Sequence, residues 1–336
     1  MKLLLIGFGT VGQGLAELLL EKKEALAKQY NFKYTVVGIN DMLKGSIYDA
    51  KGIDLAKALK TVKSDKKLTG GPEKALEMIK KAKADVMLEA TYTDIKTGEP
   101  ATSHIKEALK KGMHVITTNK GPLALNYKTL SNIARKNKAK FLYEGTVMSG
   151  SPLINLIRET LAGSEIKEIK GILNGTTNYI LTRMEEGLSY EEALKKAQEL
   201  GYAEAVPDAD VLGWDALAKV TILANSVFGA ELKPFDNPCE GITKITADDI
   251  KKAKANGKRF KLIGHIWKEG KKVKASVSPQ QVELTHPLAG VMGATNALTI
   301  ATDTVKEVTI VGPGAGRRET GYSMLNDLLH LNACKK

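Results

Sequence analysis

A glycine-rich segment that follows the first apolar run constrains this chain more than any other feature. The run Lys2–Ile6 predicts a β-strand, and Leu15, Leu18 and Leu19 then share one face of a predicted helix. Glycines between a strand and a helix allow a tight turn and bring the backbone close to a pyrophosphate, which the positive helix N-terminus attracts. The sequence therefore predicts a dinucleotide-binding turn with contacts from Gly7, Phe8, Gly9, Thr10, Val11 and Gly12.

Short apolar runs alternate with amphipathic helical stretches in the first third of the chain, which is the βαβ pattern of a parallel sheet. The predicted strands here are Lys2–Ile6, Thr35–Ile39, Val86–Glu89, His114–Thr117 and Lys140–Tyr143. An apolar stripe from Leu153 to Leu161, with Gly163 after it, predicts a helix and its end. We therefore expect an α/β Rossmann domain, a doubly wound parallel sheet that binds a nucleotide.

Beyond Gly163 a different mixture of strands and helices predicts an α+β second domain. The predicted strands are Glu165–Leu173, Phe260–Trp267, Val273–Ser278, Leu298–Ala301 and Val305–Val311. Ser189 with Glu192, and Thr246 with Asp249, have the spacing of capping boxes and predict two helix starts. A chain of 336 residues is long enough for two such domains.

The net charge of +12 raises the question of a nucleic-acid partner. The lysines lie among glutamates on polar helix faces, however, and no basic segment is interleaved with stacking aromatic residues. We therefore expect no nucleic-acid partner. No apolar run approaches the length of a membrane-spanning helix, so we expect no membrane partner either.

Only two cysteines occur, Cys239 and Cys334, and their distance and lack of metal-ligand spacing fit a reducing cytoplasm. The five histidines are scattered and predict no zinc site. The sequence leaves open whether either cysteine has a redox role.

The residue that recognises the adenosine ribose of a dinucleotide normally follows the second strand, which places it near Asn40 and Asp41. Asp41 would favour the 2′-hydroxyl of NAD. Lys44 and Lys57 are close enough in sequence to pair with the 2′-phosphate of NADP. The cofactor is therefore predicted to be NAD or NADP, with Asn40 among its contacts and the preference open.

Two polar stretches follow the third and fourth parallel strands of the predicted sheet, around Thr91 and Thr118. Ligands of doubly wound sheets bind beyond the carboxyl ends of the strands, so both stretches should flank the nicotinamide. Lys120 ends the second stretch. Most lysines of the chain are solvated, but the place of Lys120 at a strand end favours a function.

Asp215 and Lys219 are four residues apart on a predicted helix, so their side chains share one face. Such a pair is usually a surface ion pair. Ile222 and Leu223 continue that face, however, which indicates partial burial. A lysine held beside a carboxylate in a cleft is suited to proton transfer.

These residues together resemble homoserine dehydrogenase, from the glycine turn to Leu331. The motifs that carry the resemblance are Thr118-Asn119-Lys120, Glu144-Gly145-Thr146-Val147 with Gly150 and Pro152, Gly171-Ile172-Leu173-Asn174-Gly175-Thr176-Thr177-Asn178-Tyr179-Ile180, Gly201-Tyr202-Ala203-Glu204, Gly213-Trp214-Asp215 with Lys219, and Gly312-Pro313-Gly314-Ala315-Gly316. The run from Asn174 to Ile180 is highly specific, because a generic nucleotide-binding protein has no need of it. Val206, Arg317 and Arg318 depart from the family pattern.

The resemblance implies the reversible reduction of L-aspartate 4-semialdehyde to L-homoserine by NAD(P)H, in the route to threonine, methionine and isoleucine. Lys219 would be the general acid, Asp215 would orient it and contact the substrate, and Glu204 would bind the substrate ammonium group. Lys120 would lie between nicotinamide and substrate, where its charge stabilises the carbonyl oxygen. Gly316 would contact the nicotinamide side of the cofactor.

The resemblance also implies a homodimer and a monovalent cation, commonly sodium. The cation ligands would be oxygen atoms of Glu144, Val147, Ser149 and Ser151. A plain helix entry, with Ser151 as N-cap and Pro152 at the first helical position, fits the same stretch equally well.

The family suggests bounds for the functional regions. We expect an NAD(P)-binding Rossmann domain at 1–135, to which a C-terminal helix at 314–332 returns, a dimerisation region at 136–150 and 287–313, and a catalytic, substrate-binding domain at 151–286. The length of the chain predicts the short form of the family, without a C-terminal regulatory domain.

Two other functions stay open on the sequence alone: a dehydrogenase for a different amino-acid aldehyde, and a non-catalytic dinucleotide sensor. A sensor has no need of Asp215 and Lys219 at helical spacing. Aspartate semialdehyde dehydrogenase needs a thiol nucleophile, and Cys239 lies outside every predicted strand end, which counts against that activity.

Overall fold

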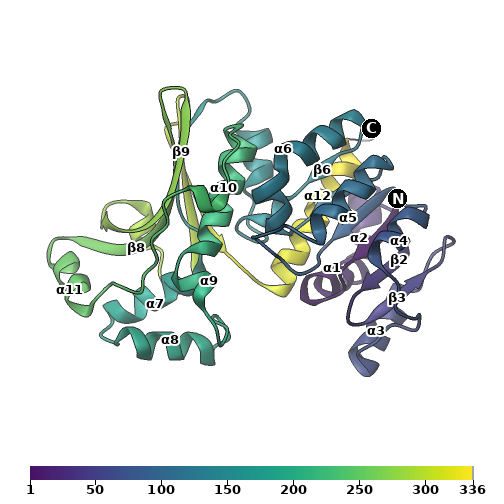
Figure 1. Ribbon diagram of the computed structural model, residues 1–336, viewed down its shortest axis with the longest axis horizontal. Helices are drawn as coiled ribbons and strands as arrows, with labels where there is room; N and C mark the ends of the chain where they lie inside the picture. Colours follow the sequence, from purple (N-terminus) through teal and green to yellow (C-terminus); the bar gives the residue numbers. More distant parts are fainter. Residues whose placement is uncertain (335–336) are drawn as a thin grey trace. The chain divides into compact units, whose positions relative to one another are not determined.

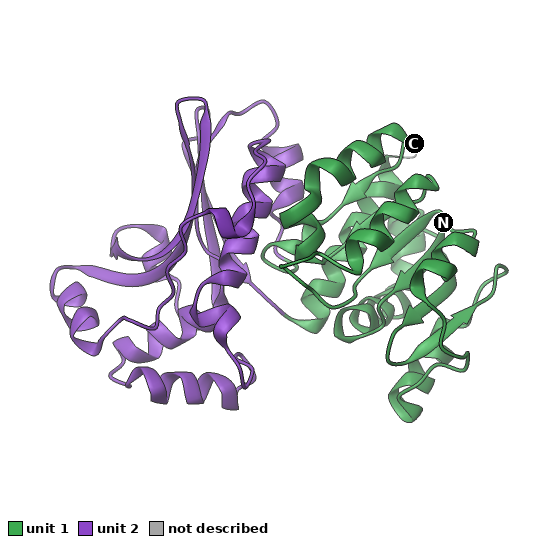
Figure 2. Ribbon diagram, viewed as in Figure 1, with its two compact units in different colours: residues 1–150, 316–336 green, residues 151–315 purple. Residues whose placement is uncertain are grey.

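The computed structural model describes residues 1–334, and the chain divides into two compact units. Unit 1 comprises Met1–Gly150 and the C-terminal segment from Gly316, and unit 2 comprises Ser151–Ala315 (Figure 2). Within residues 1–334, none of the helices combines the length and the apolar composition that crossing a membrane requires.

Unit 1 is built on a six-stranded sheet in the order β3-β2-β1-β4-β5-β6. Its strands are β1 (Lys2–Ile6), β2 (Thr35–Asp41), β3 (Gly45–Tyr48), β4 (Val86–Glu89), β5 (His114–Thr117) and β6 (Phe141–Leu142). Neighbouring strands are parallel except β2 and β3, which form an antiparallel hairpin at the edge. The order reverses at β1, so ligands are expected at the carboxyl ends of β1 and its neighbours. The predicted Rossmann fold is confirmed.

Helices cover both faces of this sheet, and each face has its own core (Figure 1). The helices of unit 1 are α1 (Thr10–Glu21), α2 (Lys23–Tyr30), α3 (Leu55–Asp65), α4 (Ala75–Lys81), α5 (Ala101–Lys110), α6 (Lys120–Lys136) and α12 (Arg317–Ala333). Leu3 and Leu5 of β1 face the core that α1, α3 and α12 complete. Leu4 and Ile6 face the core of α4, α5 and α6. Burial on both faces explains why β1 is a continuous apolar run.

The C-terminal helix α12 packs against α1 at the other end of the sequence. A Cβ on Gly14 would lie 2.2 Å from Arg317 O, so the glycine allows the two backbones to approach closely. Arg317 forms an ion pair with Glu17 (2.9 Å), and Arg318 forms one with Glu21 (2.7 Å). The two arginines that depart from the family pattern therefore link α12 to α1.

Unit 2 contains a five-stranded antiparallel sheet in the order β11-β10-β7-β8-β9. Its strands are β7 (Ile166–Ile172), β8 (Lys258–Glu269), β9 (Lys272–Glu283), β10 (Thr295–Thr302) and β11 (Glu307–Pro313). Its helices are α7 (Gly175–Glu185), α8 (Tyr190–Glu199), α9 (Asp208–Val211), α10 (Trp214–Val227) and α11 (Ala247–Ala255). A Cβ on Gly264 of β8 would lie 2.5 Å from Val220, so this glycine lets α10 lie close against the sheet. The predicted α+β second domain is confirmed.

The local predictions have mixed outcomes. Both predicted capping boxes are present, at the starts of α8 and α11. The sequence does not predict β3, a four-residue edge strand. The predicted helix at Leu153–Leu161 begins with α-helical geometry, in which Ile157 N bonds to Leu153 O (2.9 Å), but Leu156–Thr160 forms a wider π-helical turn in which Leu161 N bonds to Leu156 O (3.0 Å). None of the residues in that turn is buried, whereas Leu153, Ile154 and Leu161 on either side of it are.

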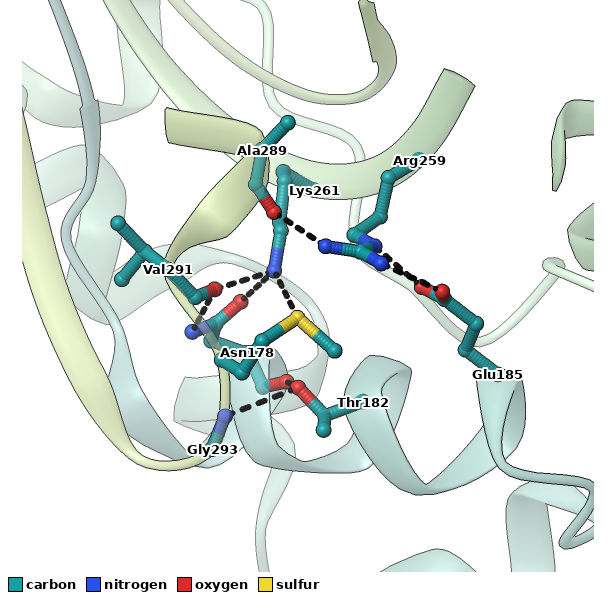
Figure 3. A network of polar contacts seen from close by, with 9 residues as sticks. Asn178, Thr182, Glu185, Arg259, Lys261, Ala289, Val291 and Gly293 are labelled. Carbon is teal, nitrogen blue, oxygen red and sulfur yellow. Dashed lines mark hydrogen bonds and ion pairs between the residues drawn. The ribbon is translucent and has the colours of Figure 1, made fainter. Parts of the chain in front are cut away.

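A buried polar network ties α7 to β8 and to the loop before β10 (Figure 3). Lys261 of β8 is 1% exposed, and its Nζ donates to Asn178 Oδ1 (2.9 Å) and to Val291 O. Arg259 of the same strand forms a two-pronged ion pair with Glu185 (2.6 and 2.9 Å). Burial lowers the pKa of Lys261 to about 8, because the ammonium group loses its water. Its acceptors Asn178 Oδ1 and Val291 O are neutral and do not compensate for that loss as a carboxylate would.

Candidate active site

The turn between β1 and α1 contains glycine where its backbone packs against other backbone. Gly7 has a φ of +92°, and a Cβ on it would lie 2.3 Å from Ala90 O. A Cβ on Gly12 would lie 2.4 Å from Gly7 O. A larger residue at either position would displace the turn.

Gly9 is a glycine of a different kind. It is the N-cap of α1, and nothing lies within 4 Å of the position that its Cβ would take. Within residues 1–334 no side chain caps this end of α1, whose first residues are Thr10 and Val11. This helix start therefore lacks a side-chain acceptor, and its first N–H groups and the helix dipole favour an anion. The turn fits the pyrophosphate of a dinucleotide in the room that a side chain at Gly9 would fill.

The end of β2 bonds to the glycine turn through the Asn40 carbonyl, which accepts from Gly7 N (2.8 Å), and through the side chain of Asp41, but not through the side chain of Asn40. Asn40 is buried, and its Nδ2 donates to Glu73 O (2.7 Å). Asp41 Oδ2 accepts a hydrogen bond from Phe8 N (2.8 Å). Asp41 Oδ1 accepts one from Lys44 N (3.0 Å), and Lys44 Nζ lies 3.5 Å from the same oxygen. In this fold the adenosine ribose binds beside the end of β2, so the geometry favours Asp41 over Asn40 as the ribose contact.

A buried carboxyl group joins the ends of β4 and β5. Glu89 is fully buried and accepts hydrogen bonds from Thr91 N (3.1 Å), from the Thr91 hydroxyl and from Thr117 Oγ1 (2.8 Å). Thr117 Oγ1 accepts in turn from Asn119 N (3.0 Å). Burial raises the pKa of Glu89, and the hydrogen bonds oppose that rise. The sequence assigns no role to Glu89, although threonines at the ends of both strands, Thr91 after β4 and Thr117 in β5, are a signal for a shared acceptor.

Lys120 is the first residue of α6 and follows directly on this hydrogen-bonded region. Asn119 caps the helix, and its Nδ2 donates to Tyr92 O (2.9 Å) in the loop after β4. The residues predicted to flank the nicotinamide, Thr91, Thr118 and Lys120, therefore lie on two loops that bond to each other at the carboxyl edge of the sheet.

Lys219 and Asp215 of α10 form a shielded pair in unit 2. Lys219 Nζ lies 2.8 Å from Asp215 Oδ2 and 2.6 Å from Leu173 O, and the lysine side chain is only 9% exposed. Asp215 lies in the first turn of α10, where the helix dipole favours a negative charge. Ile222 and Leu223 are fully buried, so the predicted burial of this helix face is confirmed.

Asn174 and Asp210 complete this group, and the sequence alone assigns neither a role. Asn174 Nδ2 donates to Asp210 Oδ1 (2.6 Å) and to Asp215 Oδ2 (3.0 Å). Burial raises the pKa of Asp210 and the charge of Asp215 raises it further, whereas Asn174 and Lys219 lower it. Asp210 lies on α9 and Asn174 precedes α7, so only the fold brings them to α10. We refer to Asn174, Asp210, Asp215 and Lys219 as the lysine–carboxylate cluster.

Glu204 lies on an exposed loop outside this cluster. Thr176 Oγ1 donates to Tyr202 O (2.7 Å) and so ties this loop to α7. Within the part of the chain that the structure describes, no hydrogen bond or ion pair joins the Glu204 carboxylate to the cluster.

The residues predicted to bind a cation fall in both units. They are Glu144, Val147 and Ser149 in unit 1 and Ser151 in unit 2. Ser149 Oγ lies 2.7 Å from Thr320 Oγ1, and Ser151 Oγ donates to Pro313 O (3.1 Å). Residues 1–334 contain no group of three or more His, Cys, Asp or Glu side chains suited to a metal ion. A cation here would therefore depend on carbonyl and hydroxyl oxygens as well as on one carboxylate.

Two further predicted positions have clear surroundings. Gly316 is the N-cap of α12 with a φ of +141°, and a Cβ on it would lie 2.0 Å from Glu319 Oε2. Cys239 Sγ donates to Leu212 O (3.4 Å), and burial raises the pKa of its thiol to about 11. A thiol that stays protonated at neutral pH is a poor nucleophile, which agrees with the case against acyl-enzyme chemistry.

Comparison with known proteins identifies the family. The family profile described as "Homoserine dehydrogenase" matches residues 152–329, and the profile "Homoserine dehydrogenase, NAD binding domain" matches residues 7–144. The chain belongs to the homoserine dehydrogenase family. It is therefore an NAD(P)-dependent oxidoreductase, which confirms the predicted enzyme class and sets the non-catalytic sensor aside.

Individual homoserine dehydrogenases match over nearly the whole chain. The NAD(+)-dependent homoserine dehydrogenase of Pseudomonas canavaninivorans is 44% identical over 337 residues, which cover 98% of this chain and 96% of the relative. A crystal structure from Archaeoglobus fulgidus is 40% identical with a TM-score of 0.91 and 99% coverage of both chains. A hyperthermophilic archaeal homoserine dehydrogenase in complex with NADPH is 30% identical with a TM-score of 0.83, covering 100% of this chain and 98% of that one.

Proposed function

We propose that the chain catalyses the reversible reduction of L-aspartate 4-semialdehyde to L-homoserine, a step toward threonine, methionine and isoleucine. The shielded pair of Lys219 and Asp215 is the observation that carries this proposal. Hydride delivery to an aldehyde places negative charge on oxygen and requires a proton donor nearby. Membership of the homoserine dehydrogenase family supports the choice of substrate.

Lys219 is the general acid in this proposal. Two of its three N–H groups are donated to Asp215 Oδ2 and Leu173 O, which fixes Nζ and leaves the third for the substrate oxygen. Asp215 orients the lysine and contacts the substrate. Lys120, at the first position of α6, stabilises the negative charge that develops on the carbonyl oxygen.

Carboxylates of unit 2 recognise the substrate ammonium group. Glu204 takes this role by its place in the family motif, and its exposure leaves the side chain accessible. Asp210 adds a second carboxylate beside the lysine–carboxylate pair, through Asn174. An anionic surface of this kind favours an amino-acid aldehyde over an aldehyde without an amino group.

Unit 1 binds the dinucleotide in this proposal. The pyrophosphate lies on the glycine turn at Gly9, and Thr91, Thr118, Lys120 and Gly316 contact the nicotinamide side. The bound cofactor supplies or accepts the hydride. Among relatives, one is named NAD(+)-dependent and another is solved with NADPH, which supports NAD or NADP as the cofactor of this chain.

Two expectations from the family stay predictions. We expect a homodimer through 136–150 and 287–313, which light scattering of the purified chain tests. We also expect sodium to bind oxygen atoms of Glu144, Val147, Ser149 and Ser151, and replacement of sodium by a bulky organic cation tests that site.

The function is tested by absorbance at the nicotinamide band with L-homoserine and either NAD or NADP. We expect homoserine-dependent reduction of at least one cofactor. A longer amino alcohol, L-2-amino-5-hydroxypentanoate, serves as the competitor for the alternative of a different amino-acid aldehyde. Faster turnover of that compound, or dinucleotide binding without turnover of either, would contradict the homoserine assignment.

A further inference from the structure

Asn174 occupies a position where all parts of its side-chain amide have partners. It is the N-cap of α7 and is 4% exposed. Its Oδ1 accepts hydrogen bonds from Thr177 N (2.9 Å) and Thr177 Oγ1 (3.0 Å). Its Nδ2 donates to Asp210 Oδ1 (2.6 Å) and to Asp215 Oδ2 (3.0 Å). One amide therefore connects a helix start to two carboxylates on two other helices.

These partners determine which way the amide is turned. The N–H of Thr177 requires an acceptor, so the oxygen of Asn174 must lie on that side. Asp210 and Asp215 are acceptors when ionised, so they require the nitrogen with its two donors. The flipped amide would place a donor against a donor and an oxygen against two carboxylates.

No other N-cap residue meets both requirements. Aspartate at 174 would cap α7 but would add a third carboxylate to Asp210 and Asp215. Serine or threonine would cap the helix with an acceptor oxygen but has a single O–H donor and a shorter reach. Asparagine at this position therefore meets the need of the two carboxylates for two N–H donors, in addition to the need of the helix start for an acceptor.

We propose that Asn174 is a positioning residue that keeps Asp210 and Asp215 ionised side by side, so that Asp215 holds Lys219 in place for proton transfer. This inference rests on the proposed function of the cluster. Asp215 Oδ2 accepts from both Lys219 Nζ and Asn174 Nδ2, so two donors fix its position. Removing the amide leaves two neighbouring carboxylates without the two N–H donors between them, which favours uptake of a shared proton.

The surroundings of Asp210 support this reading. Burial and the charge of Asp215 raise the pKa of Asp210, whereas the hydrogen bond from Asn174 and the charge of Lys219 lower it. On α9 itself, Asp208 lies two residues before Asp210, and its charge contributes to raising the pKa of Tyr190 of α8. The Asn174 amide thus donates to both carboxylates of the cluster.

The test compares Asn174→Ser, Asn174→Asp and the wild-type chain. Asn174→Ser keeps an N-cap acceptor and loses the double donor. We expect a fall in kcat/KM of about 10-fold to 100-fold, as for a small misplacement of a catalytic group. The acidic limb of the kcat/KM against pH profile should move up by about one pH unit, because the carboxylate pair takes up a proton more readily. Asn174→Asp should be more severe on both measures.

Ser189→Ala is the matched control, because it removes the N-cap of α8 away from the cluster. It should lower the Tm as Asn174→Ser does and leave the pH profile unchanged. A fall in activity and Tm for Asn174→Ser with an unmoved profile would overturn the inference and leave Asn174 a helix cap.

A titration that needs no turnover separates this inference from the proposed function. Carboxyl resonances of isotope-labelled aspartate are followed with pH in the wild-type chain and in Asn174→Ser. We expect the apparent pKa values of the Asp210 and Asp215 pair to rise in the variant, and unchanged values would overturn the inference. Absence of homoserine turnover in the wild-type chain would contradict only the proposed function.

Discussion

The candidate site of unit 1 consists mainly of backbone groups, whereas that of unit 2 consists of side chains. The glycine turn of unit 1 offers backbone N–H groups at an uncapped helix start, and its central residue, Gly9, has open space where a side chain would be. The cluster of unit 2 consists of side chains from three elements, and the side chains of Lys219 and Asp215 are largely shielded from water. Unit 1 is thereby suited to hold an anionic cofactor, whereas unit 2 is suited to move a proton. Substitutions should be able to damage either property separately.

Lys219→Ala should abolish proton transfer in unit 2 and leave dinucleotide binding by unit 1 intact. We expect kcat for homoserine to fall by about 1,000-fold, within the range for loss of a general acid. Dinucleotide affinity should not change, because the glycine turn is untouched. Steady-state kinetics and fluorescence titration with the reduced cofactor measure the two effects. Lys195→Ala, on an exposed position of α8, is the control and should leave both values unchanged.

Gly9→Ala should weaken dinucleotide binding by unit 1 and leave proton transfer in unit 2 intact. A methyl group there meets no protein atom within 4 Å, so the Tm should be nearly unchanged. It fills the room assigned to the pyrophosphate, and loss of one hydrogen bond to a charged group weakens dinucleotide binding roughly 10-fold to 100-fold. Gly12→Ala is the contrast, because its methyl group would lie 2.4 Å from Gly7 O and should lower the Tm as well. Equal Tm losses in both variants would contradict this account of Gly9.

Asp41→Ser sharpens the comparison within unit 1. The Asp41 carboxylate is bonded to the glycine turn through Phe8 N, so it places a negative charge beside the ribose position. Its removal should shift the ratio of kcat/KM values for NAD and NADP about tenfold toward NADP, since the 2′-phosphate no longer meets a like charge. Asp54→Ser, at the N-cap of α3, is the control. An unchanged ratio for Asp41→Ser would show that the carboxylate does not face the ribose.

Lys261→Met tests a buried charge of unit 2 that lies outside the cluster. Burial lowers the pKa of Lys261 from 10.5 to about 8, so the unfolded chain binds more protons between these two pH values. The wild-type free energy of unfolding should therefore rise relative to the variant as pH increases from about 8 to about 10.5, by about 1–3 kcal/mol. Below pH 8 the difference should be constant. Urea denaturation across this range measures it, and a difference independent of pH would contradict the shift. Of the four variants, Lys261→Met should change homoserine turnover at neutral pH the least.

The sequence predicts local features well because they depend on neighbouring residues. The glycine turn, the bounds of β1, β4 and β5, and the Asp215–Lys219 pair all follow from short spacings along the chain. The sequence places the ribose contact near Asn40 and Asp41 without choosing between them, and in the structure the Asn40 side chain donates to Glu73 O while the Asp41 carboxylate accepts from Phe8 N of the turn. Adjacent residues of a strand point to opposite faces, so this choice needs the exact register of β2.

The remaining parts of the site depend on long-range contacts. Asn174 meets Asp210 and Asp215 only after α7, α9 and α10 have packed together. Glu89 acquires its role when Thr117 of the adjacent strand donates to it. The spacing of these residues carries no period that a helix or a strand would impose, so pattern analysis has nothing to detect.

Side-by-side measurement of dinucleotide binding and homoserine turnover in Lys219→Ala and Gly9→Ala tests the division of labour most directly. We predict that Lys219→Ala binds the dinucleotide as the wild-type chain does and fails to turn over at any cofactor concentration. We predict that Gly9→Ala binds poorly and recovers most of its kcat at saturating cofactor. Loss of dinucleotide binding in Lys219→Ala in proportion to its loss of turnover would contradict the account.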